Sequence, residues 1–297
     1  MATLPTVPPI ATITMSKGRT KRPFGRYQQP WRAMTYVVVV LVSIASVFPL
    51  YWMFVTSLLT EHDAYAATPV FWPDWQWTNY ARAWAMAPWV QYFTNSLLIS
   101  GCTIVLAVIT SLLAGYAFGM MKFPGRQALF LAILALIMIP FEATLIPSYL
   151  ITSSLGWIDS YQAQIIPFGV SISGIFLLRQ FFMTLPDSLW EAAQIDGCSR
   201  FKFLWLIAAP LARPALAVVA LQVLIGSWNA FLWPYLVTSS DAFRPVEVGL
   251  KAFTTADGTD PTGLAAAAAF TTLPILLVFL MAQKQFIEGI SVGSTKG

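Results

Sequence analysis

The chain of 297 residues is 57% hydrophobic and only 10% charged. Because an ordinary soluble domain has about 25% charged residues, this composition indicates a polytopic membrane protein and excludes an ordinary soluble domain. The formal net charge of +4 comes from basic residues in short segments between apolar runs. Basic residues in such short segments are explained by the orientation of the protein in the membrane. They do not form a basic patch, so we expect no nucleic-acid partner.

Residues 1–33 are rich in Pro and Thr and show no apolar periodicity, so we predict a disordered cytoplasmic tail. The apolar run that begins at Met34 is far longer than the apolar region of a signal peptide, about 7–15 residues. Residues 34–297 are therefore expected to form an all-α transmembrane domain with six membrane helices. Their predicted bounds are about 34–59, 95–121, 129–151, 162–182, 211–237 and 264–282.

Two polar segments between these helices are expected on the external side. Residues 60–92 contain several tryptophans, which gather at membrane surfaces, and residues 238–263 are polar. With the N-terminus inside, the basic residues that fall in external segments are only Arg82, Arg244 and Lys251 of 17 Lys and Arg. Since cytoplasmic loops carry the excess of basic residues, both termini and residues 186–208 are predicted to be cytoplasmic.

A polar and basic stretch, Pro186–Pro214, interrupts the apolar pattern. Ser188 and Glu191 have the Ser-x-x-Glu spacing of a capping box, which predicts that a helix begins there. Gly197 predicts a turn at the end of this helix, and a second helix is expected to begin at Ser199. The stretch therefore predicts two short helices joined by a glycine elbow.

This spacing resembles the EAA loop of permease subunits in bacterial ATP-binding-cassette (ABC) importers. The extended form EAA-x-IDG-x-S-x-F, Trp228-Asn229 and the C-terminal end are similar to the carbohydrate branch, in particular its maltose-type second permease, over about residues 35–297. The resemblance implies a MetI-like permease fold and a coupling loop at 186–208 that sits in a cleft of the ATPase. The coupling residues would be Glu191, Ala192, Ala193, Asp196, Gly197 and Pro210. The alternative is an ordinary loop in which Gly197 only ends a helix.

The same resemblance implies the partners: a homologous permease, two ATPase subunits, an external substrate-binding protein and a small sugar, in the inner membrane among lipid. The sequence contains no G-x-x-x-x-G-K-[ST] phosphate loop. We therefore expect no enzyme activity, no catalytic residue and no cofactor in this chain, with ATP and Mg on the partner ATPase. The two cysteines, Cys102 and Cys198, are expected to be too far apart for a disulfide, and His62 has no partners at metal-ligand spacing.

Polar side chains inside membrane helices are the candidates for a substrate path, because they are costly in lipid unless they face a cavity or a partner. Gln222 and Asn229 are seven residues apart and so would share one helix face. Amides and an aromatic ring together suit sugar hydroxyls, although they equally suit hydrogen bonds to a neighbouring helix. The candidates are Gln222, Ser227, Trp228, Asn229, Glu142, Phe168 and Ser171.

Other functions remain open at this level. No predicted membrane helix places a basic residue at its centre, which favours a neutral carbohydrate over glycerol-3-phosphate, while a polyol fits equally well. A stand-alone secondary transporter or facilitator would need internal repeats and buried ionisable groups, of which only Glu142 is a candidate. An intramembrane enzyme would need catalytic groups that the sequence does not contain.

Overall fold

The computed structural model describes residues 29–255 and 258–291. These residues divide at Pro49 into two units, each of which is described by itself. The first unit consists of the N-terminal part of α1 (Gln29–Ser57), an apolar helix. The tail predicted at 1–33 lies mostly outside the described residues, which begin at Gln29 with α1.

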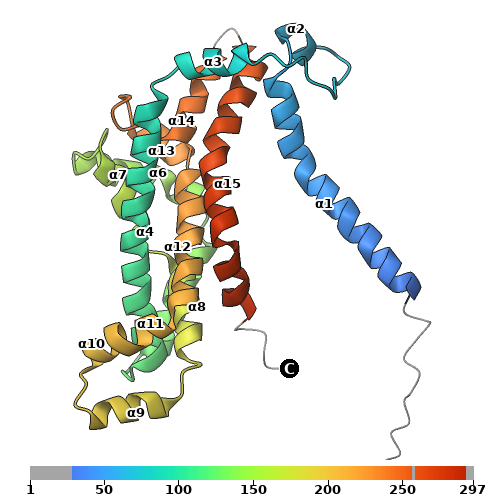
Figure 1. The fold of residues 1–297 in the computed structure, drawn as a ribbon. Coiled ribbons are helices and arrows are strands. Elements are labelled where there is room, and N and C mark those ends of the chain that lie inside the picture. The colour runs from blue at the N-terminus through green and yellow to red at the C-terminus, as the bar shows by residue number, and fades with distance from the viewer. Residues whose placement is uncertain (1–28, 256–257, 292–297) are drawn as a thin grey trace, which may run out of the picture. The chain divides into compact units, whose positions relative to one another are not determined.

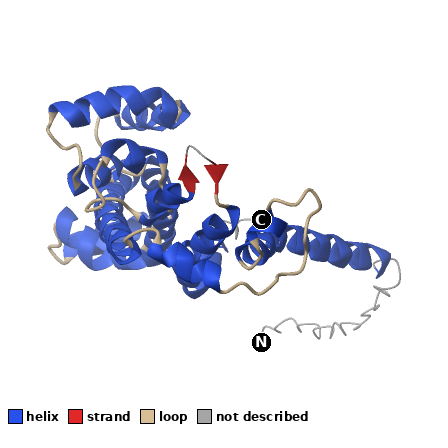
Figure 2. Cartoon of the chain, turned by 90° about the horizontal axis from the view of Figure 1, so that it is seen from above, coloured by secondary structure: helices blue, strands red, loops and turns tan. Residues whose placement is uncertain are grey.

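The second unit is almost entirely helical. Short helical turns of other pitch, η1 (Leu136–Met138), η2 (Ile166–Phe168), η3 (Leu204–Ala208) and η4 (Leu250–Phe253), join several of its elements. Figure 2 shows β1 (Thr254–Thr255) and β2 (Gly258–Thr259) as the only strands of the described chain. The helices are α2 (Glu61–Ala64), α3 (Thr78–Ala85), α4 (Trp89–Met120), α5 (Arg126–Ala135), α6 (Phe141–Ser154), α7 (Tyr161–Ile165), α8 (Ile172–Phe182), α9 (Asp187–Ile195), α10 (Arg200–Phe203), α11 (Ala209–Leu211), α12 (Arg213–Trp228), α13 (Leu232–Val237), α14 (Val246–Gly249) and α15 (Pro261–Ser291).

The described helices provide four to six membrane spans by length and composition. Four are long and apolar enough alone, namely Met34–Ser57, Trp89–Met120, Tyr161–Phe182 and Pro261–Met281. Two further spans arise if each of two bent pairs counts as one, with a bend of 98° between Met138 and Phe141 and of 79° between Leu211 and Arg213. The predicted all-α membrane fold is confirmed.

Three predicted spans are interrupted in the structure, because proline and local capping end their helices. In 129–151, Pro140 takes an extended conformation before α6. In 162–182, the helix gives way at η2, which contains a proline, and α8 begins only after Ser171, whose hydroxyl accepts a hydrogen bond from the Gly174 amide. The span 211–237 is divided into α12 and α13 by residues 229–231. Each of these three spans is therefore helical but not continuous.

Helix α4 is the central element of the second unit and packs against α8 and α12, with α12 lying between α4 and α15 (Figure 1). Gly115 and Gly119, one turn apart on α4, make the approach of α8 possible. A Cβ atom on Gly115 would lie 2.7 Å from the Leu178 Cβ atom, and one on Gly119 would lie 2.8 Å from the Phe182 Cβ atom. Small residues at this spacing allow two membrane helices to pack closely.

The two ends of this helical group carry different segments. Figure 1 shows α3 and α14 at one end of α4 and α9 and α10 at the other. Arg82 on α3 holds the first end together, because it forms ion pairs with Glu61 on α2 and with Asp260 before α15, the latter at 3.2 Å. The predicted external segments 60–92 and 238–263 thus come together, away from the predicted coupling loop.

Candidate functional site

The first helix of the elbow at 186–208 begins two residues earlier than the capping box predicts. Helix α9 starts at Asp187 after Pro186, which makes no side-chain cap, so Ser188 lies inside the first turn. The capping box of Ser188 and Glu191 is therefore wrong. Pro186 has an extended conformation that suits the residue before a helix, and the Asp187 carboxylate lies near the positive end of the helix dipole.

The glycine turn itself is confirmed. Gly197 has a φ of +70°, a conformation that glycine adopts without strain. Its amide donates to the Gln194 carbonyl at 3.0 Å, and the Cys198 amide donates to the Ala193 carbonyl at 2.8 Å, so the last carbonyls of α9 are satisfied. Helix α10 then begins as predicted after Ser199, whose hydroxyl accepts from the Lys202 amide at 3.3 Å.

The two faces of α9 differ in the way that a docking helix requires. Ala193 is 4% exposed and packs inward. Glu191, Ala192 and Asp196 are exposed, and Ile195 is 87% exposed. Within the described residues, Glu191 forms no ion pair. An acidic group and an apolar side chain therefore face outward from a helix that is fixed on its other side.

Aromatic contacts join the elbow to the long helices. The Trp190 ring meets the Phe203 ring edge-on at 5.2 Å, and the Arg200 guanidinium lies over Trp190 at 4.5 Å. Tyr116 on α4 lies 5.8 Å from Phe182 on α8 and 6.3 Å from Phe203, between ring centroids. One buried cluster thus contains side chains from α4, α8, α9, α10 and α12, so α9 and α10 are packed directly onto the long helices.

Pro210, the last predicted coupling residue, is exposed in α11. Proline lacks an amide hydrogen and is tolerated only where no intrahelical bond is needed, as at the start of a helix. The 79° bend between Leu211 and Arg213 lies directly before Pro214, which occupies the first turn of α12. Pro210 therefore lies at the junction between the elbow and α12, and it does not belong to the exposed face of α9.

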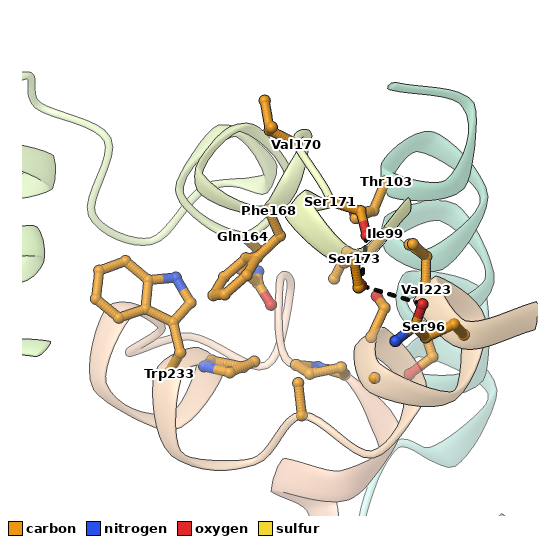
Figure 3. Close-up of a pocket in the computed structure, with 16 residues that line it drawn as sticks. Ser96, Ile99, Thr103, Gln164, Phe168, Val170, Ser171, Ser173, Val223 and Trp233 are labelled. Atoms are coloured by element: carbon orange, nitrogen blue, oxygen red, sulfur yellow. Dashed lines mark hydrogen bonds between the residues drawn. The ribbon is translucent and has the colours of Figure 1, made fainter. Parts of the chain in front are cut away.

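A pocket of about 230 Å³ lies farther along the same helices (Figure 3). Figure 3 shows Gln164, Phe168 and Trp233 on one side and Thr103, Ile99 and Ser96 on the other. Its remaining polar lining comes from α8, α12 and the residue that caps α8. These side chains are Ser171, Ser173, Gln222 and Ser227.

Several lining groups bond to one another, but two do not. The Ser173 hydroxyl donates to the Gln222 side-chain oxygen at 3.1 Å (Figure 3). By contrast, Gln164 Oε1 and Thr103 Oγ1 are buried and have no hydrogen-bond partner within the described chain. A buried polar atom without a partner costs about 1–3 kcal/mol, and these two atoms have almost no accessible surface, so neighbouring protein atoms enclose them.

The predicted substrate-path residues divide into two groups. Four line the pocket: Gln222, Ser227, Phe168 and Ser171. Trp228 does not, because it is buried in another cluster and its Nε1 donates to the Thr271 carbonyl at 3.2 Å. Asn229 also lies outside the lining, because α12 ends at Trp228 and the helical spacing from Gln222 no longer applies. Glu142 is exposed in the first turn of α6, away from the lining.

The residues missed from the sequence are Thr103, Gln164 and Trp233. Each is a polar or aromatic residue in a predicted membrane helix, as Ser171 and Phe168 are, so the available signal was the same. What distinguishes them is tertiary packing. Trp233, for example, lies on α13 beyond the break at 229–231, and its Nε1 donates to the Ala163 carbonyl at 2.8 Å.

Neither the cysteines nor the acidic residues form a further site. Cys102 and Cys198 are both free thiols. Within residues 29–255 and 258–291, no group of three or more His, Cys, Asp or Glu side chains is placed to hold a metal ion.

Comparisons with known proteins agree with this geometry. The family of binding-protein-dependent transport system inner membrane components matches residues 107–292. The arabinooligosaccharides transport system permease protein AraQ of Bacillus subtilis (strain 168) is 36% identical over 207 residues, which are 70% of this chain and 74% of that protein. The sn-glycerol-3-phosphate transport system permease protein UgpE of Yersinia pestis is 31% identical over 264 residues, which are 86% of this chain and 94% of that protein.

Two solved structures share the fold. A chain of a bacterial ABC transporter involved in the import of the acidic polysaccharide alginate superposes with a TM-score of 0.77 at 22% identity, over 89% of this chain and 99% of that chain. A chain of the bacterial alginate ABC transporter in complex with alginate pentasaccharide-bound periplasmic protein gives a TM-score of 0.60 at 17% identity, over 87% and 96%. This chain thus has the same fold as these two chains.

Proposed function

The chain belongs to the family of inner membrane components of binding-protein-dependent transport systems, and from this premise we propose that it is the permease subunit of an ATP-driven importer for a carbohydrate. It forms half of the translocation path and carries no nucleotide site of its own. The family membership favours this role over the stand-alone transporter that the sequence left open.

The observation that carries the proposal is the elbow formed by α9, Gly197 and α10. Its outer face presents Glu191, and its inner face is joined by Trp190 and Phe203 to the buried cluster shared with α4, α8 and α12. The same three long helices line the pocket. Closure of an ATPase dimer that grips α9 would therefore reorient the walls of the pocket, which is the coupling that an importer needs.

The substrate class rests on the relatives and on the lining of the pocket. AraQ is named for arabinooligosaccharides and UgpE for sn-glycerol-3-phosphate. The described lining contains no Asp, Glu, Lys, Arg or His, and an anionic substrate would call for a basic partner. A neutral mono- or oligosaccharide is therefore the first candidate, with glycerol-3-phosphate or a polyol second.

The remaining subunits follow from the role. The path is completed by a homologous permease, and two ATPase subunits bind ATP and Mg. An external binding protein delivers the sugar to the end that carries α3 and α14, and both termini and the elbow face the cytoplasm. One alginate transporter structure is described as a complex with a periplasmic protein, which supports this arrangement by analogy of fold.

The test is ATPase activity of the complex, co-expressed with its partners and reconstituted, with and without sugar. Gly197→Pro removes the amide that donates to Gln194 and cannot adopt a positive φ. We expect the variant to assemble and to lose sugar stimulation. Gly197→Asn is the control, since asparagine keeps the amide and tolerates a positive φ, and a Cβ atom there meets nothing within 4 Å. Normal coupling in Gly197→Pro would reject the elbow as the lever.

A further inference from the structure

Helix 200–211, which comprises α10, η3 and α11, runs across the direction of the membrane segment that follows it. Its axis is bent by 79° from that of α12. Figure 1 shows α10 and α11 across one end of α4, with α9 farther from the long helices than they are. Because membrane helices tilt on average by only about 20° from the bilayer normal, a helix bent this far from α12 runs close to the membrane surface.

The two faces of helix 200–211 have different surroundings. Phe203 and Ala208 belong to the buried cluster shared with α4 and α8. On the other face, Phe201 is 67% exposed, Trp205 41% and Leu206 70%. The Phe201 and Trp205 rings meet edge-on, with their centroids 6.1 Å apart. Packing among the described residues thus leaves two aromatic rings and a leucine uncovered, and an apolar patch of this kind marks a contact with a partner or a membrane.

The charges of the elbow are divided between its two helices. The acidic side chains all belong to α9 or to the residue that ends it, namely Asp187, Glu191 and Asp196. Residues 197–240 contain no Asp or Glu, and their basic residues are Arg200, Lys202 and Arg213. The helix nearer the long membrane helices is therefore basic, whereas the helix farther from them is acidic.

Lys202 is the cation that is available on this helix. It is exposed, and its ammonium forms no ion pair with the described residues. Arg200 differs, because its guanidinium lies over the Trp190 ring. A lysine beside apolar side chains can lay its methylene stem along them and place its ammonium among lipid headgroups. Helices that lie in the headgroup region combine Trp, Phe and Leu with basic residues in this way, and those basic residues attract anionic lipids.

We propose that helix 200–211 lies on the membrane surface at the end that carries α9 and binds an anionic phospholipid there. Phe201, Trp205 and Leu206 enter the boundary between headgroups and acyl chains, and the Lys202 ammonium pairs with the headgroup phosphate. The bilayer covers this face, and not the ATPase, because the face is basic and apolar and because the acidic helix α9 lies farther out. The contact does not depend on which substrate the chain transports.

A fluorescent dye on helix 200–211 tests this contact in the whole complex. Leu206→Cys, in a variant that lacks Cys102 and Cys198, would carry bimane in lipid nanodiscs that contain doxyl-labelled phosphatidylglycerol or phosphatidylcholine. We expect the doxyl lipids to quench the dye strongly and water-soluble acrylamide to quench it weakly. Ile195→Cys is the matched control, since Ile195 is also apolar and is 87% exposed but lies on α9. The doxyl lipids should have little effect there.

Three results would overturn the proposal. Strong quenching by acrylamide at position 206 would show that water covers this face. Protection from both quenchers would show that protein covers it, either an ATPase or a second permease. Equal quenching by doxyl lipid at positions 206 and 195 would show that helix 200–211 has no lipid contact of its own.

The preference for an anionic headgroup is tested with Lys202→Gln. The relative affinity for phosphatidylglycerol over phosphatidylcholine follows from the quenching of the dye at position 206 in mixed bilayers. We expect Lys202→Gln to lower this relative affinity about fivefold, the effect of one basic residue near an anionic surface. Lys251→Gln is the control, because Lys251 is exposed in η4, within the predicted external segment, and should leave the relative affinity unchanged.

The headgroup assignment is overturned if wild type shows no preference for phosphatidylglycerol, or if Lys202→Gln keeps the wild-type preference. These results are independent of the test of the proposed function. The dye reports what covers helix 200–211, whereas sugar-stimulated ATPase activity reports whether the chain couples transport to an ATPase.

Discussion

At the scale of single residues, Asp159 links two segments that are distant in the sequence. Its Oδ1 accepts hydrogen bonds from the Ser240 amide at 3.0 Å and the Ser239 amide at 2.9 Å. The bond to Ser240 is the main cause that lowers the pKa of the Asp159 carboxyl below its ordinary value. A carboxylate that accepts two backbone amides is stabilised in its charged form. Asp159 thus ties the loop before α7 to the segment after α13.

This link predicts a small stability that depends on pH. Because folding lowers the pKa, the contribution of Asp159 is complete above the ordinary aspartate pKa of about 4 and is lost as the pH falls through the folded-state pKa. Asp159→Ala should lower the Tm of the purified protein at pH 7 by about 2–4 °C, through the lost hydrogen bonds and because alanine is strained at the φ of +58° that Asp159 adopts. The difference from wild type should shrink below about pH 4.

The control for this prediction is Asp159→Asn. Asparagine keeps an acceptor oxygen and tolerates the φ of +58° at this position, but it does not titrate. Its melting curve should therefore lie between those of wild type and Asp159→Ala at pH 7. A difference between wild type and Asp159→Ala that stays constant from pH 3 to pH 7 would contradict the role of the charged carboxylate.

At the scale of elements, we expect the close contact of α4 with α8 to contribute strongly to the stability of the second unit. Gly115→Ala would place a Cβ atom 2.7 Å from the Leu178 Cβ atom and 3.1 Å from the Arg179 amide nitrogen. Since backbone must move to relieve it, overpacking should cost about 1–3 kcal/mol. The expected decrease in Tm is on the order of 5 °C in a detergent melting experiment.

Gly101 provides the matched control on the same helix. A Cβ atom there meets nothing within 4 Å, and alanine is the better helix former by about 1 kcal/mol. Gly101→Ala should therefore leave the Tm unchanged or raise it. Equal effects of the two substitutions would mean that helix propensity, and not the approach of α8, determines the result.

The helices also show how much of the fold the length of the apolar segments can predict. Long apolar runs predict the existence and approximate place of α4 and α15 well, because each is helical from end to end. They do not predict the 98° bend after Met138 or the interruption at 229–231. A helix can be interrupted inside the membrane only where other elements provide hydrogen-bond partners for its free backbone groups. Those partners lie elsewhere in the sequence, so the hydrophobic pattern of one segment does not reveal them.

At the scale of the whole molecule, the orientation in the membrane can be measured with the natural cysteines. Cys198 is half-exposed beside the elbow, at the end opposite to α3 and α14. In a Cys102→Ala background, a membrane-impermeant maleimide should label Cys198 only in inverted vesicles. The physical reason for this expectation is the excess of basic residues around the elbow, since such an excess is typical of cytoplasmic segments.

A cysteine at the other end completes this measurement. Thr255 is exposed in β1, so Thr255→Cys in a variant that lacks both natural cysteines should be labelled only in right-side-out cells. Labelling of both positions from the same side would contradict the predicted number of membrane crossings between them. Labelling of Cys198 from outside and of Thr255→Cys from inside would show that the predicted orientation is reversed.

The sequence by itself determined that this is a polytopic membrane protein and that a glycine turn joins two short helices at 186–208. It also provided the orientation in the membrane that we expect. These depend on composition, on local signals such as Gly197 and Ser199, and on the distribution of Lys and Arg, all of which act along the chain. Only the tertiary structure decided which polar residues meet. In the structure, Trp228 lies in a buried cluster and Asn229 lies beyond the end of α12. Thr103, Gln164 and Trp233 line the pocket together with Gln222. The physical reason is that a pocket is formed by breaks and packing among helices far apart in the sequence, where helical spacing along one segment no longer applies.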